Sequence, residues 1–128
     1  DAEPLTLSFS HLNELFQQAY AEHAVSEDNL KKIHQLDLWV IEKLRVAFGN
    51  RIVAHMKKFV PVYIACGGTE VDGVDYFLAR KVLRKFEQLN VSYIRDEIDG
   101  YIDFLDKTFG KGKMKECEEY LLRLKKMA

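Results

Sequence analysis

Residues 91–109, VSYIRDEIDGYIDFLDKTF, form the most regular stretch of the chain. Apolar side chains recur there every three or four residues, which is the period of one face of an α-helix. They are Val91, Ile94, Ile98, Tyr101, Ile102, Leu105 and Phe109. Gly110-Lys111-Gly112 then breaks the pattern. The stretch therefore predicts a long amphipathic helix that ends at these glycines.

The same period marks helices near the two ends of the chain. Ser10 is expected to cap a first helix, because a serine side chain accepts a backbone hydrogen bond at a helix start. The apolar face of this helix is formed by Leu12, Leu15, Phe16, Ala19 and Tyr20. That of the last helix is formed by Met114, Cys117, Leu121 and Leu124.

Ser26 is expected to cap a second helix, with acidic Glu27 and Asp28 in the first turn, where the helix dipole favours negative charge. Its apolar stripe consists of Leu30, Ile33, Val40, Ile41, Leu44 and Phe48. Asp37 interrupts the stripe and leaves two alternatives, a break between two helices or an exposed position on one long helix. Gly49 supplies the flexible backbone that a helix C-terminus prefers.

A third helix is expected downstream of Gly49. Its apolar face consists of Ile52, Val53, Met56, Phe59 and Val60. Pro61 lacks a backbone donor and should kink or stop this helix. The β-branched and aromatic residues at 62–65 permit a short strand, but we favour a kinked helix because no partner strand is visible.

Gly67, Gly68 and Gly73 are expected to form a flexible turn before a long fourth helix. Its core-facing residues are Val74, Leu78, Val82, Phe86 and Leu89, and its other faces carry Arg80, Lys81, Arg84 and Lys85. The sequence thus predicts an all-α fold: one helical bundle domain over residues 1–128, with about six helices and a possible kink at Pro61.

Composition excludes several functional classes. The 128 residues are 48% apolar and 30% charged, which is not typical of a disordered chain. No apolar run approaches the ~20 residues that span a bilayer, and no signal peptide is visible, so no membrane contact is expected. The net charge of -1 does not indicate a nucleic-acid surface. Cys66 and Cys117 are expected to be small buried hydrophobes in a reducing, cytoplasmic compartment.

No catalytic apparatus is visible in this chain. The four histidines, His11, His23, His34 and His55, include no pair at helical i, i+4 spacing, and no Cys-x-x-Cys occurs, so no metal site is indicated. A Cys66–histidine nucleophilic pair has no local support. Gly67-Gly68-Thr69 lacks the lysine and spacing of a phosphate-binding P-loop, and we interpret it as a turn.

Charge is segregated near the C-terminus. Acids dominate from Val91 to Asp106, at Asp96, Glu97, Asp99, Asp103 and Asp106. Bases dominate afterwards, at Lys107, Lys111, Lys113, Lys115, Arg123, Lys125 and Lys126. Two interpretations are open: two solvated faces that attract each other in an antiparallel hairpin, or a basic tail that contacts an acidic partner or nucleic acid.

Two motifs resemble the C-terminal helical region of McrB-like AAA+ ATPases. The first is Phe48-Gly49-Asn50-Arg51, followed by Phe59. The second is DYFLARKVLRKF at residues 75–86, and Glu119-Tyr120-Leu121-Leu122-Arg123-Leu124 is similar to the tail helix of these proteins. The resemblance spans Leu36 to Leu89. Arg84 stands where proline is frequent in that family, and Lys57-Lys58-Phe59-Val60-Pro61 is unusual for it.

This resemblance implies that the chain is the C-terminal lid of a larger ATPase. The lid would close over nucleotide and contact neighbouring subunits of a homo-oligomer. An N-terminal ATPase core outside this chain would carry the P-loop and bind ATP and Mg²⁺. Arg51 would be the sensor-2-like residue that reaches the nucleotide phosphates, a role that suits the always-charged fork of arginine. The alternative for Arg51 is a salt bridge to a nearby carboxylate such as Glu42 or Asp75.

A stand-alone helical module for protein–protein interaction is the competing function. The chain holds more aromatic residues than one small core needs, namely Trp39, Tyr63, Tyr76, Phe77 and Tyr93. A helical bundle with such residues at its surface can bind a partner helix in a groove.

Overall fold

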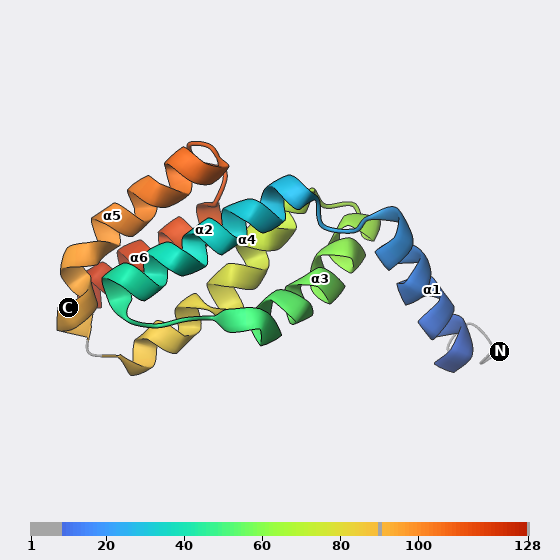
Figure 1. Cartoon of the computed structure of the whole chain (residues 1–128), viewed down its shortest axis with the longest axis horizontal. Coiled ribbons are helices and arrows are strands. Elements are labelled where there is room, and N and C mark those ends of the chain that lie inside the picture. Colours follow the sequence, from blue (N-terminus) through green and yellow to red (C-terminus); the bar gives the residue numbers. More distant parts are fainter. Residues whose placement is uncertain (1–8, 90, 128) are drawn as a thin grey trace.

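The computed structural model describes residues 9–89 and 91–127, and in this part of the chain the regular secondary structure is all helical (Figure 1). Six α-helices and one 3₁₀ helix follow in order: α1 (Phe9–Glu22), α2 (Glu27–Leu44), α3 (Gly49–Ala65), α4 (Glu70–Lys81), η2 (Leu83–Gln88), α5 (Val91–Phe109) and α6 (Lys115–Met127). The prediction of an all-α bundle of about six helices is confirmed.

The helices pack around a central pair, α4 and α6. Helix α3 lies against one side of α4, and α5 lies against α6 and α2. Helix α1 packs mainly on α3 and extends from the edge of the bundle, at the opposite end of the molecule from the C-terminus (Figure 1). Helix α1 is therefore attached to the bundle mainly through α3, and the other helices enclose most of the core.

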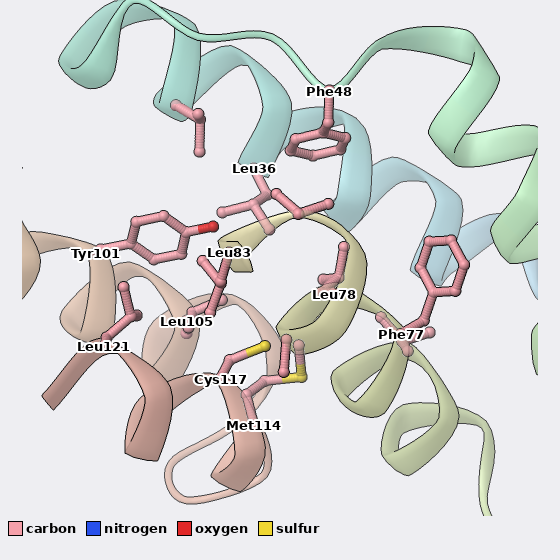
Figure 2. Close-up of a cluster of buried hydrophobic side chains, with 14 of the residues drawn as sticks. Leu36, Phe48, Phe77, Leu78, Leu83, Tyr101, Leu105, Met114, Cys117 and Leu121 are labelled. Atoms are coloured by element: carbon pink, nitrogen blue, oxygen red, sulfur yellow. The ribbon is translucent and has the colours of Figure 1, made fainter. Parts of the chain in front are cut away.

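The core is built from apolar side chains of α2 to α6. Those with no exposed surface are Leu36, Val40, Val60, Val74, Leu83, Leu105 and Met114. Figure 2 shows how side chains of α2, α4, η2, α5 and α6 converge there. Burial of one leucine side chain stabilises a fold by about 1.5–3 kcal/mol, so each of these residues contributes on that scale. Helix α1 adds one buried residue, Ala19.

A buried carboxylate joins α4 to the start of α6. Asp75, with 3% of its surface exposed, accepts hydrogen bonds from the backbone N–H groups of Glu116 (2.8 Å) and Cys117 (2.9 Å). The Cys117 thiol donates to the backbone carbonyl of Asp75. The first N–H groups of a helix have no acceptor within it, so Asp75 caps α6 from a distant part of the sequence.

A second carboxylate joins α4 to the start of α2. Ser26 caps α2 as expected, because its hydroxyl oxygen accepts the N–H of Asn29 at 3.2 Å. Glu70, the first residue of α4, accepts the hydroxyl (2.8 Å) and the N–H (3.2 Å) of Ser26, and the side-chain amide of Asn29. This contact places the starts of two helices side by side.

A third carboxylate fixes the entry to α3. Helix α2 is one long helix, and Asp37 lies half-buried on it, where its carboxylate accepts the N–H of Phe48 at 3.1 Å. The helix ends at Leu44, four residues before the expected end at Phe48. Arg45, with φ of 60°, is its left-handed cap, and Gly49 begins α3 instead of ending α2.

Helix α3 continues through Pro61. It runs from Gly49 to Ala65, so residues 62–65 are helical, as we favoured, and form no strand. Pro61 itself is buried. Helical packing on both sides of the proline outweighs the loss of one backbone hydrogen bond.

Three other boundaries differ from expectation. Helix α1 begins at Phe9, so Ser10 lies inside its first turn and is not its cap. Helix α4 begins at Glu70, so Gly73 lies within the helix and not in the turn before it. The absence of a side chain at Gly73 makes room for the ring of Tyr63, because an added Cβ would lie 3.1 Å from Tyr63 Cδ1. The expected long fourth helix ends at Lys81, and the tighter η2 follows it.

We predict that Asp75→Asn destabilises the protein by about 2–3 kcal/mol, because the amide replaces one acceptor oxygen with a donor that faces an N–H of α6. Urea unfolding measures the change. Asp96→Asn, on the exposed surface of α5, is the matched control and should change stability by less than about 0.5 kcal/mol. Equal effects of the two substitutions would show that Asp75 is not a cap.

Candidate functional site

Arg51 lies in the first turn of α3 on a firmly anchored segment. Phe48, just before the helix, is 5% exposed and packs in the core, and its N–H is held by Asp37. Gly49 has φ of 66°, a conformation that favours glycine, so the chain turns sharply into the helix there. The backbone that carries Arg51 is thus fixed by contacts on the N-terminal side.

The Arg51 side chain is exposed, and within residues 9–89 and 91–127 it makes no ion pair or hydrogen bond. The alternative of a salt bridge to Asp75 or Glu42 is therefore wrong for this structure. Asp75 is buried against α6, and Glu42 is exposed on α2 without a bond to Arg51. Arg51 is available to a group outside the described part of the chain, as the sensor-2-like interpretation requires.

An apolar groove lies between α1 and α3. It encloses a cavity of about 390 Å³. The apolar lining of this cavity consists of Leu12, Leu15, Phe16, Ala19, Val62 and Ala65. A neighbouring cavity of about 350 Å³ shares Phe16 and Val62 and adds Tyr20, His55, Lys58 and Phe59. Leu12, Leu15 and Phe16 are between 37% and 45% exposed, although they form the helical stripe that the sequence assigns to the core-facing side of α1.

The cysteines differ in environment. Cys117 is buried, as expected, and burial followed by the nearby Asp75 carboxylate raises the pKa of its thiol well above the ordinary value. Cys66 is exposed, so the expectation that it is a buried hydrophobe is wrong. It caps the C-terminal end of α3, at the rim of the α1–α3 groove, where His23 also lies.

The Gly67-Gly68-Thr69 segment is a helix-to-helix turn. Gly67 has φ of 105°, and an added Cβ on Gly68 would overlap the Tyr63 ring. The Thr69 hydroxyl oxygen accepts the N–H of Asp72 at 3.1 Å and so caps α4. Gly67, Gly68 and Thr69 therefore form the turn between α3 and the capped start of α4, as the sequence indicated.

The charge segregation near the C-terminus corresponds to a contact between helices. Helices α5 and α6 pack together, and Lys125 Nζ lies 2.9 Å from Asp99 Oδ1. The attraction between an acidic and a basic helix is confirmed at this pair. The pair is exposed, so it contributes at most about 1 kcal/mol.

Glu118 on α6 is the most perturbed carboxyl group. Partial burial, a hydrogen bond to Asp106 and the negative charges of Asp106 and Asp75 together raise its pKa to about 7. Within the described residues, its Oε2 atom is buried and has no hydrogen-bond partner. Glu118 therefore takes up a proton near neutral pH when the protein is folded.

Metal ligands are not gathered in the part of the chain that the structure describes. No group of three His, Cys, Asp or Glu side chains there is arranged to hold a metal ion. No helix among residues 9–89 and 91–127 is long and apolar enough to cross a membrane.

Comparison with known proteins gives no match: no protein-family model, curated protein or solved structure is significantly similar to this chain.

We predict that the stability of the protein falls as pH rises from 5 to 8, and that Glu118→Gln removes much of this fall. The unfolded carboxyl has a pKa near 4.5 and the folded one near 7, so the folded state binds more protons between these values. The stabilisation is complete below about pH 4.5 and is lost as pH rises through about 7. Urea unfolding at several pH values measures it. Parallel pH profiles of the two proteins would contradict the assignment.

Proposed function

We propose that this chain is the helical lid of an ATPase similar to the McrB-like AAA+ proteins. The observation that carries the proposal is the exposed, unpaired Arg51 on an anchored helix start, within residues 9–89 and 91–127. An arginine that stabilises a fold normally binds an internal carboxylate or carbonyl. Here the anchoring is done by Phe48 and Asp37, which leaves the guanidinium for an external phosphate.

In this function the chain supplies no catalytic group. The ATPase core, on the N-terminal side of this region in the resembling proteins, supplies the P-loop and binds ATP and Mg²⁺. Lid closure brings Arg51 to the β- and γ-phosphates, where its positive charge offsets the negative charge of the nucleotide. The same closure alters contacts with a neighbouring subunit of a homo-oligomer. Cytoplasmic location follows from this proposal.

A second candidate function is a protein-interaction module. The α1–α3 groove supports it, because an apolar cavity of about 390 Å³ beside exposed Leu12, Leu15 and Phe16 suits an apolar partner surface. The two functions are compatible, since the groove and Arg51 involve different parts of α3. The lid proposal accounts for the exposed guanidinium of Arg51, and the interaction module accounts for the apolar lining of the α1–α3 groove.

We expect that the isolated chain binds ATP–Mg²⁺ only weakly and does not hydrolyse it, because it lacks a loop of backbone amides that surrounds the phosphates. Calorimetric titration and a phosphate-release assay test this expectation. A micromolar dissociation constant for the chain alone would show that the nucleotide site is complete within it, and the lid proposal would fail.

We further predict that Arg51→Ala leaves the melting temperature of the isolated chain nearly unchanged and lowers ATP turnover of the intact protein. A charge-assisted hydrogen bond to phosphate contributes about 1.5–3 kcal/mol, which corresponds to a loss of roughly tenfold or more. Lys57→Ala, an exposed residue of the same helix, is the control and should leave turnover unchanged. A large loss of stability in the isolated Arg51→Ala chain would assign Arg51 a structural role instead.

A further inference from the structure

A second cluster of arginines lies on another part of the molecule, where α4, η2 and α6 meet. These three elements surround an open cavity of about 380 Å³. It is lined by Ala79, Arg80, Arg84, Glu87, Glu116, Tyr120 and Arg123. Three arginines and two glutamates therefore face one space, and one aromatic ring forms part of its wall.

Both glutamates already have partners. The Tyr120 hydroxyl donates a hydrogen bond to Glu87 Oε1. Glu116 Oε1 lies 3.4 Å from Arg80 Nη2, and the Arg80 guanidinium is also 3.5 Å from the centre of the Tyr76 ring. The acids thus neutralise at most part of the positive charge of the cavity.

Arg84 and Arg123 are left without an acidic partner in the described part of the chain. The Arg123 guanidinium lies 5.4 Å from the centre of the Tyr120 ring. Arg84 and Arg123 both act electrostatically on the Tyr120 hydroxyl, whose pKa burial and Glu87 raise to about 12 in spite of them. Two guanidinium groups from different elements, Arg84 of η2 and Arg123 of α6, therefore line one open cavity beside the Tyr120 ring.

We propose that this cavity binds a phosphate group through Arg84 and Arg123. Two guanidinium forks offer several N–H donors in two planes, which matches the three terminal oxygens of a phosphate monoester better than the two oxygens of one carboxylate. The hydrogen bond from the Tyr120 hydroxyl to Glu87 joins α6 to η2 beside the two arginines. The site is independent of Arg51 and of the proposed lid function.

The test is a titration of the ¹⁵N-labelled chain followed by NMR at constant ionic strength. Inorganic phosphate, phosphoserine and AMP are the three phosphate probes, a glutamate-rich peptide is titrated as the carboxylate comparison, and chloride sets the ionic strength. We expect saturable shifts of the Arg84 and Arg123 side-chain Nε–Hε signals, with dissociation constants of about 1 mM. The probe with the lowest constant identifies the source of the phosphate: a free anion, a modified side chain or a nucleotide.

Arg84→Gln and Arg123→Gln should each weaken binding by about tenfold. Both side chains are exposed, so the variants should fold, which circular dichroism checks. Arg95→Gln removes the same charge from an exposed position on α5 and should leave binding unchanged. Three results would overturn the proposal: no saturable shift, equal weakening in all three variants, or tighter binding of a glutamate-rich peptide than of any phosphate probe.

Discussion

The hydrogen bonds from the start of α6 to the buried carboxylate of Asp75 are the interaction on which the bundle depends. A free helix start exposes N–H groups that must find an acceptor, and burial makes an unpaired group costly. Asp75 supplies that acceptor at 2.8 and 2.9 Å from inside α4. The same contact brings Cys117 and Met114 into the core and sets how α6, and with it α5, lies against the rest of the molecule.

This device recurs in the fold. Glu70 holds the start of α2, and Asp37 holds the turn before α3, so three helices begin at a carboxylate supplied by another element. Each contact joins segments that helical periodicity cannot connect. At the start of α3 the backbone is anchored by the hydrogen bond to Asp37 and by the buried Phe48 ring, and the Arg51 side chain takes no part in this anchoring.

Sequence periodicity predicts the helices well and their boundaries less well. The stripe at residues 94–109 corresponds to the buried face of α5, because local spacing determines which face of a helix is apolar. The stripe at residues 30–44 corresponds to the buried face of α2 except at Ile41, which is 40% exposed. The end of α2 and the place of Gly73 could not be predicted, because they depend on contacts of Asp37 and of the Tyr63 ring that helical periodicity does not specify. The exposure of Cys66 depends likewise on where α3 ends.

One of the two candidate sites could be proposed from the sequence, and the other appears only in the folded structure. Arg51 could be proposed from sequence, because it belongs to the Phe48-Gly49-Asn50-Arg51 motif that carries the family resemblance. The second arginine cluster could not, because Arg84 and Arg123 meet only through the packing of η2 and α6. The functions proposed for both rest on the same physical property, a guanidinium without an internal acid among the described residues.

Hydrogen exchange of the Glu116 and Cys117 amides tests the central role of Asp75 most directly. N–H groups in the first turn of a helix normally exchange fast, because they have no acceptor within the helix. If Asp75 holds α6 in place, these two amides exchange only with global unfolding, at the rate of the most protected core amides. Exchange as fast as that of the exposed Asn50 and Arg51 amides, in the first turn of α3 that has no side-chain cap, would contradict this account.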